Sequence, residues 1–224
     1  MFIVFDFDGT LHVSAATYMP AFRETLAWLE TRGQTPACDL DEAAVGYWLG
    51  VDSAQMWALV APDAPRQLRE ACAEHMRATI LQLARAGQAR LYEHIPETLD
   101  ALSDDGHELV LLSNCRHDYL KTFTDVFGLT RWFAHRYCGQ DYGWAPKSEV
   151  FARIAAQLGH AGVPPRDEFV VVGDRYHDIG IAREHGLRSV GCAYGYGSRD
   201  ELADASVIAE SSAELLGAIR SIVS

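Results

Sequence analysis

The sequence contains few lysines, few basic residues overall and no long apolar run. Lys121 and Lys147 are the only lysines, and 19 basic residues stand against 31 acidic ones, which gives a formal net charge of −12. This excess of negative charge excludes binding along a nucleic-acid backbone or an anionic membrane surface. Because no run of 18 apolar residues is present, we expect no membrane-spanning helix.

The cysteines form no recognisable framework either. There are 5 of them, an odd number, and no CxxC pair occurs. This pattern excludes a disulfide scaffold and a zinc knuckle, and it is typical of proteins in a reducing cytosol. The apolar run at the N-terminus ends at Asp6 without a preceding basic segment, so it is too short for a signal peptide. We therefore expect a cytoplasmic protein.

The chain has 224 residues, of which 49% are hydrophobic and 22% charged, so it can bury a sizeable core. Segments 2–5, 109–112 and 169–172 are continuous apolar runs, which predict central parallel strands covered on both faces. Weaker strand candidates occupy 135–138 and 188–193. Helices are expected at 96–105, 117–127, 147–158, 178–185 and 212–222. This alternation predicts an α/β doubly wound fold.

Residues 14–93 do not follow the alternation. Tyr18, Phe22, Leu26 and Leu29 recur at helical spacing, and a second long apolar stripe ends at Gly87. We interpret 14–93 as a helical insertion. Residues 1–13 and 94–224 would then form the α/β core.

Acidic side chains follow the first and last of the three strong strands. Asp6 and Asp8 come directly after segment 2–5, and their side chains face one side, roughly 6–7 Å apart at the backbone. Gly9 allows a sharp turn after them. Asp174 and Asp178 follow segment 169–172. Each pair taken alone is also explained by a surface turn, a helix cap or a solvated loop.

Three further polar residues belong with these acids. Ser113 and Asn114 follow the apolar run of the second strong strand, 109–112. Lys147 begins the helix that precedes the third strong strand, 169–172. Taken singly, an N-cap serine and a solvated lysine explain them. Since ligand sites in such sheets open at the carboxyl ends of the strands, we expect all of these residues to converge on one crevice.

The ordered set resembles the four motifs of the haloacid dehalogenase-like hydrolase superfamily. These motifs are DxDGT at 6–10, Ser113–Asn114, Lys147 and GDxxxD at 173–178, and the resemblance covers essentially the whole chain. The insertion resembles the α-helical cap of the phosphoglycolate phosphatase-like branch. The resemblance implies a Rossmann-like core with this cap. It also implies a Mg²⁺-dependent phosphatase, monomer or homodimer, that acts on a small phosphorylated metabolite such as phosphoglycolate or a sugar phosphate.

The resemblance also implies roles for the core residues. Asp6 would attack phosphorus and form an aspartyl-phosphate, while Asp8 would act as general acid and then as general base. Lys147 would neutralise the nucleophile and the phosphoryl oxygens. Ser113 and Asn114 would hold a phosphate oxygen.

The implied metal site uses oxygen ligands. Asp6, the backbone carbonyl of Asp8, and Asp174 would bind Mg²⁺, and Asp178 would act from the second shell or through a water. Histidines near the motifs are expected on the surface or in supporting roles rather than as metal ligands, because Mg²⁺ prefers oxygen; they are His12, His117 and His177. Two alternative functions stay open: a phosphomutase of the same family, and a non-catalytic phosphate-binding regulatory protein.

The sequence departs from the family's motifs in three places. Lys147 is followed by Ser148 and Glu149 rather than by the common proline. His12 stands where an aliphatic residue usually follows the first motif. Cys115 and Arg116 follow Asn114, where a small residue or a lysine is frequent. The sequence assigns no specific role to His12, Cys115 or Arg116.

Overall fold

The computed structural model describes residues 1–37, 48–49, 53–160, 162 and 166–223. The chain divides into two compact units, one formed by Met1–Val13 with Leu91–Ser224 and the other by Ser14–Arg90. Parts of the expected insertion, at 38–47 and 50–52, lie outside the described residues. Among the helices that are described, none has the length and apolar character needed to cross a bilayer.

A six-stranded parallel sheet forms the centre of the first unit. Its strands lie in the order β3-β2-β1-β4-β5-β6. Their bounds are Phe2–Phe5 for β1, Glu108–Ser113 for β2, His135–Cys138 for β3, Phe169–Gly173 for β4, Arg188–Cys192 for β5 and Val207–Ala209 for β6. The three continuous apolar runs are the adjacent strands β2, β1 and β4, in which Phe2 pairs with both Glu108 and Phe169. The predicted α/β fold is confirmed.

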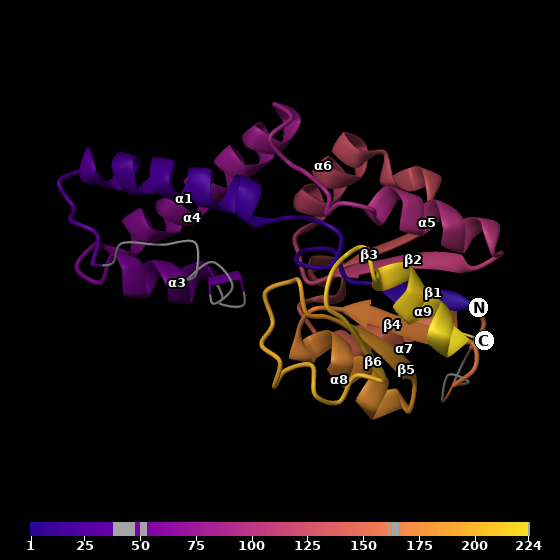
Figure 1. The fold of residues 1–224 in the computed structure, drawn as a ribbon. Coiled ribbons are helices and arrows are strands. Elements are labelled where there is room, and N and C mark those ends of the chain that lie inside the picture. The colour runs from indigo at the N-terminus through magenta and orange to yellow at the C-terminus, as the bar shows by residue number, and fades with distance from the viewer. Residues whose placement is uncertain (38–47, 50–52, 161, 163–165, 224) are drawn as a thin grey trace. The chain divides into compact units, whose positions relative to one another are not determined.

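Helices cover the sheet on both faces. They are α5 (Ile95–Asp104), α6 (His117–Phe127), α7 (Lys147–Gln157), α8 (Tyr176–His185) and α9 (Leu215–Val223), with 3₁₀ turns η2 (Leu129–Arg131) and η3 (Gly139–Tyr142). Figure 1 shows α5 and α6 on one side of the sheet and α7 and α8 on the other. Apolar side chains of α7 and α8, among them Phe151 and Ile181, pack with Val4, Val110 and Val171 of the strands. Burial of both faces explains why these strands have no polar alternation.

The second unit is helical in its described part. It contains α1 (Ala15–Glu30), α3 (Ser53–Val60) and α4 (Arg66–Arg85), and both α1 and α3 pack on α4. Phe22 stacks on Trp57 with ring centroids 5.5 Å apart, and both side chains are fully buried. The apolar stripes of α1 and α4 therefore form the core of this unit.

The first unit resumes at Leu91. Leu91 pairs with His12 as an isolated bridge, and the backbone N–H of Tyr92 donates to the carbonyl of Leu11 at 2.9 Å. These backbone contacts bind 91–92 to the core, although the sequence pattern assigns them to the insertion.

Candidate active site

The residues that the sequence singled out lie at the carboxyl ends of neighbouring strands. Asp6 follows β1, and its backbone N–H donates to the carbonyl of Val172 on β4 at 2.9 Å. Ser113 ends β2, Asp174 follows β4, and Lys147 begins α7. Because all of these strands are parallel, the chain brings these residues to one edge of the sheet.

Lys147 is the positive centre of the site. Its Nζ donates to Asp6 Oδ1 and, at 2.6 Å, to Asp178 Oδ1. All three side chains are buried. Burial alone would lower the pKa of Lys147, but the charges of Asp178 and Asp6 outweigh it and raise that pKa above its ordinary value. Lys147 is therefore a permanent cation.

Three buried carboxylates lie close together in this site, and two of them accept hydrogen bonds from Lys147. Asp6, Asp174 and Asp178 each offer an oxygen, and these oxygens lie within 4.8 Å of one another. Burial raises the pKa of Asp6 well above its ordinary range; Lys147 lowers it in part, and the charges of Asp178 and Asp174 raise it further. Burial, with the charge of Asp178, raises the pKa of Asp174 to about 7. This cluster is short of positive charge and consists of the oxygen donors that Mg²⁺ prefers, so its residues fit a divalent cation.

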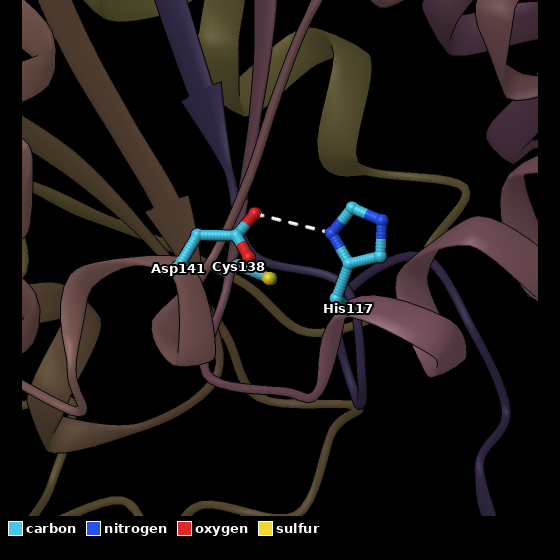
Figure 2. A group of neighbouring side chains, drawn as sticks. All are labelled: His117, Cys138 and Asp141. Carbon is cyan, nitrogen blue, oxygen red and sulfur yellow. Dashed lines mark hydrogen bonds and ion pairs between the residues drawn. The ribbon is translucent and has the colours of Figure 1, made fainter.

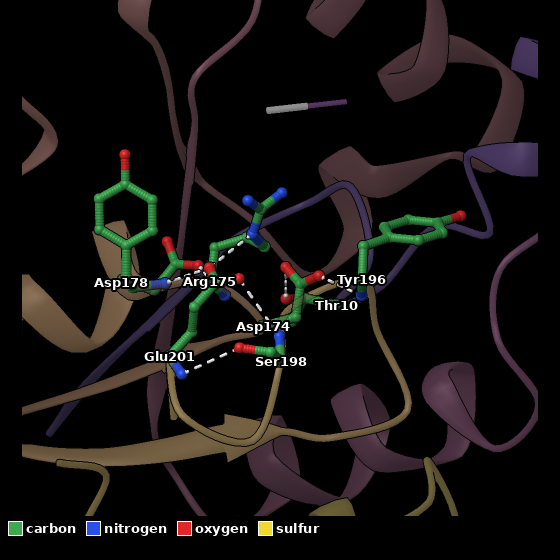
Figure 3. A network of polar contacts seen from close by, with 8 residues as sticks. Thr10, Asp174, Arg175, Asp178, Tyr196, Ser198 and Glu201 are labelled. Carbon is green, nitrogen blue, oxygen red and sulfur yellow. Dashed lines mark hydrogen bonds and ion pairs between the residues drawn. The ribbon is translucent and has the colours of Figure 1, made fainter. Parts of the chain in front are cut away.

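Asp174 is tightly enclosed (Figure 3). Its Oδ2 accepts the backbone N–H of Tyr196 at 2.7 Å, and its Oδ1 lies 3.5 Å from the hydroxyl of Thr10. Gly9 has φ +84°, and a Cβ there would lie 2.2 Å from Asp174 Oδ2. The glycine of the first motif is thus required both by its backbone conformation and by the approach of this carboxylate.

A second set of contacts fixes the start of α8, also visible in Figure 3. Asp178 Oδ2 accepts the backbone N–H of Arg175 at 3.1 Å. The Arg175 side chain donates to Glu201 at 2.8 Å, and the same carboxylate accepts the backbone N–H of Tyr176 at 3.3 Å. Glu201 and Arg175, neither of which the sequence analysis identified, therefore hold the helix end that presents Asp178 to Lys147.

Asp8 has different surroundings from the other acids. Its side chain is 27% exposed, and its Oδ1 accepts hydrogen bonds from Tyr119 Oη at 2.8 Å and from His12 Nδ1 at 2.9 Å. His12 is fully buried, with its ring stacked on Phe7 at 5.1 Å. Burial and then the charge of Asp8 raise the pKa of Tyr119 well above its ordinary value, so its phenol stays protonated and donates.

We expect His12 on the surface or in a supporting role from the sequence, and the structure places it, buried, in contact with Asp8. The sequence did not identify Tyr119, because a tyrosine in the first turn of a helix carries no signal of its partner 111 residues away. The one signal in the sequence near this contact is His12, a histidine where the family usually has an aliphatic residue, and the structure shows that it binds Asp8.

The last residue of β2 and the residue that follows it differ in exposure. Ser113 is buried and pairs with Cys138 of β3, whereas Asn114 is exposed. Since Phe5 pairs with Leu111, the parallel register places Ser113 level with the residues just beyond Asp6. Burial raises the pKa of Cys115, so this thiol is neutral near pH 7. Arg116 is exposed.

Comparison with known proteins settles the family. The family model for haloacid dehalogenase-like hydrolases matches residues 1–186. The chain belongs to this family. Within the haloacid dehalogenase-like hydrolases it falls in the phosphoglycolate phosphatase-like branch, and it is a phosphatase-type hydrolase.

One curated relative bears on this placement, and two solved structures share the fold. A phosphoglycolate phosphatase of Agrobacterium fabrum is 31% identical over 199 residues, which are 86% of this chain and 80% of the relative. A predicted phosphoglycolate phosphatase from Haemophilus somnus 129pt has the same fold, with a TM-score of 0.79, 21% identity and 96% of each chain covered. A β-phosphoglucomutase candidate from Thermotoga maritima also shares the fold, with a TM-score of 0.72, 17% identity and 99% of each chain covered.

Proposed function

We propose that this protein is a Mg²⁺-dependent phosphatase that hydrolyses a small phosphomonoester through an aspartyl-phosphate on Asp6. One observation carries the proposal: Lys147 binds Asp6 and Asp178 in a buried cluster whose carboxylates, with Asp174, exceed its positive charge. A nucleophilic carboxylate and a phosphate dianion repel each other, so a site for this reaction needs concentrated positive charge.

Asp6 is the nucleophile in this proposal. A carboxylate oxygen of Asp6 forms a bond to phosphorus while the bond from phosphorus to the leaving oxygen breaks. Lys147 stabilises this reaction electrostatically, because its ammonium offsets the negative charge of Asp6 and of the phosphoryl oxygens. Ser113 and the backbone of Asn114 bind a phosphoryl oxygen at the end of β2.

The metal would be held by Asp6, by Asp174 and by the backbone carbonyl of Asp8, with Asp178 acting through Lys147 or a water. When bound, Mg²⁺ supplies Lewis-acid stabilisation of the phosphoryl oxygens. Asp174 is well suited to this position, since Tyr196 and the close approach at Gly9 fix its carboxylate.

Asp8 transfers the protons. It gives its proton to the leaving oxygen in the first step, and it takes a proton from the water that attacks the aspartyl-phosphate in the second. Its partial exposure supports this role, because the carboxyl must reach both the leaving group and water. Tyr119 and His12 hold it in place through Oδ1.

We further propose 2-phosphoglycolate as the first substrate to test, since the Agrobacterium fabrum relative is named for it. The unit Ser14–Arg90 would act as the family's helical cap and choose among leaving groups. A screen of phosphorylated metabolites, with sugar phosphates included, identifies the preferred ester.

The proposal is tested with Asp6→Asn. Because an amide cannot form the acyl-phosphate, this variant is expected to lose turnover while its thermal unfolding stays cooperative. Asp125→Asn is the matched control: Asp125 is an exposed partner of Lys121 on α6, and its replacement is expected to leave turnover unchanged. Activity of Asp6→Asn within tenfold of the wild type would reject the nucleophile.

The same assays separate the two alternatives. A phosphomutase would return the phosphoryl group to a sugar and would require a sugar bisphosphate activator. A non-catalytic binding protein would show no turnover on any ester in the screen. The proposed phosphatase releases inorganic phosphate without an activator.

A further inference from the structure

A second cluster of potential metal ligands lies at the same edge of the sheet. His117 begins α6, Cys138 ends β3, and Asp141 lies in η3. One donor atom from each lies within 4.8 Å of the other two, and His117 Nδ1 is 3.3 Å from Asp141 Oδ2. Figure 2 shows the imidazole and the carboxylate facing each other, with the sulfur beside the carboxylate. The three donors are nitrogen, sulfur and oxygen, unlike the all-oxygen catalytic cluster.

Contacts other than those among the three side chains also hold these elements together. Cys138 pairs with Ser113 across β2 and β3. The Gln140 side chain accepts the backbone N–H of His117 at 3.0 Å, and the Gln140 backbone N–H donates to the carbonyl of Cys115 at 3.3 Å. The three donor atoms therefore lie close together before any ligand binds, so binding loses less conformational entropy.

Opposing effects act on the pKa of the Cys138 thiol. The side chain is fully buried, and burial raises its pKa; the carboxylate of Asp141 raises it further, whereas the backbone N–H groups of Asp141 and Gln140 lower it. Backbone N–H groups directed at sulfur favour a thiolate, and the adjacent carboxylate disfavours it. A cation bound between the thiolate and the carboxylate would reverse the second effect.

We propose that His117, Cys138 and Asp141 bind Zn²⁺ or another divalent metal with the same preference for nitrogen and sulfur. Thiolate, imidazole and carboxylate are the ligands that zinc takes in proteins, and three of them leave one position for water. His117 and Asp141 have side chains that are 66% and 51% exposed, so the metal and that water can enter from solvent.

The fit requires only a small adjustment. Zinc bond lengths of 2.0–2.3 Å place tetrahedral ligand atoms about 3.3–3.6 Å apart. The three donor atoms lie within 4.8 Å of one another, and the imidazole and carboxylate are already 3.3 Å apart, so the two exposed groups need to approach the sulfur by on the order of 1 Å at most. This proposal departs from the expectation that His117 is not a metal ligand. That expectation rests on the preference of Mg²⁺ for oxygen, which zinc does not share. The proposed site does not depend on the phosphatase assignment.

Cobalt is the probe, because Co²⁺ occupies zinc sites and reports a thiolate ligand by its charge-transfer absorption in the near ultraviolet. The full-length protein is titrated with Co²⁺ in excess Mg²⁺, which saturates the all-oxygen cluster. The wild type is expected to develop this absorption with one equivalent of Co²⁺, and an equivalent of Zn²⁺ is expected to remove it.

Variants assign the ligands. Cys138→Ser is expected to lose the absorption, and His117→Gln and Asp141→Asn to weaken Co²⁺ binding at least tenfold. Cys115→Ser, a change of the neighbouring thiol outside the cluster, is expected to keep wild-type binding. The two exposed positions keep the test valid if the buried Cys138→Ser variant is unstable. No thiolate absorption in the wild type, its persistence in folded Cys138→Ser, or unchanged affinity in both His117→Gln and Asp141→Asn would overturn the proposal.

Discussion

Replacing Tyr119 with phenylalanine removes one hydrogen bond from Asp8 and leaves the aromatic packing in place. The hydroxyl donates to Asp8 Oδ1 at 2.8 Å, and the ring packs on Phe123 with centroids 4.4 Å apart. A hydrogen bond to a charged group contributes about 1.5–3 kcal/mol, and about 1.36 kcal/mol corresponds to a tenfold change in rate. Because His12 still holds the same oxygen, we expect the lower end of this range. Turnover of an alkyl phosphate should therefore fall about tenfold.

The assay compares two leaving groups. A nitrophenolate departs with little protonation, so Tyr119→Phe should lower p-nitrophenyl phosphate turnover by less than about threefold. Tyr142→Phe is the matched control, because its hydroxyl lies 3.4 Å from Gln157, away from Asp8, and both substrates should be unaffected. Thermal denaturation checks that each variant is folded. If Tyr119→Phe lowers both substrates equally, or behaves like Tyr142→Phe on the alkyl ester, Tyr119 does not position the acid.

Three further outcomes follow from the site. Activity should disappear when the metal is chelated and return when Mg²⁺ is added. Ca²⁺ should inhibit, because its larger and more flexible coordination shell would turn Asp6 away from in-line attack. Full activity in excess chelator would contradict the metal role. Gly9→Ala should destabilise the fold by about 1–3 kcal/mol and weaken Mg²⁺ binding, because the added Cβ would lie 2.2 Å from Asp174 Oδ2. Unchanged thermal stability and unchanged Mg²⁺ affinity would refute this packing argument. Replacing residues 14–90 with a short linker should spare some hydrolysis of an aryl phosphate but erase discrimination among metabolites, and an unchanged substrate profile would show that this unit does not select.

Most of the core fold could be predicted because its strands are apolar on both faces. Segments 2–5, 109–112 and 169–172 became β1, β2 and β4, and the helices between them end near the glycines that follow in the sequence. Strand β6, Val207–Ala209, was not predicted, since three residues at an edge leave too short a pattern. The sequence pattern assigns Leu91 and Tyr92 to the insertion. Their pairing with the loop after β1 is made by backbone atoms, so no pattern of side chains indicates it.

The candidate site was predictable where its residues stand at strand ends. The parallel strands place their carboxyl ends at one edge of the sheet, and this brings together the side chains of Asp6, Lys147, Asp174 and Asp178. The residues that hold these groups were not predictable, since Tyr119 and Glu201 act through single long-range hydrogen bonds. The group of His117, Cys138 and Asp141 has no CxxC spacing. The pairing of β2 with β3 and the contacts of Gln140 bring it together, and no sequence pattern records either of them.

The aspartyl-phosphate on Asp6 is the central claim, and trapping it is the most direct test. In Asp8→Asn the second step lacks its base, so the intermediate should accumulate with p-nitrophenyl phosphate, whose leaving group needs little acid. Rapid acid quenching followed by peptide mapping should find phosphate on the peptide that contains Asp6, and none in the Asp6→Asn, Asp8→Asn double variant. Phosphate on another residue, or no phosphoenzyme although Asp8→Asn still releases nitrophenolate, would contradict the account.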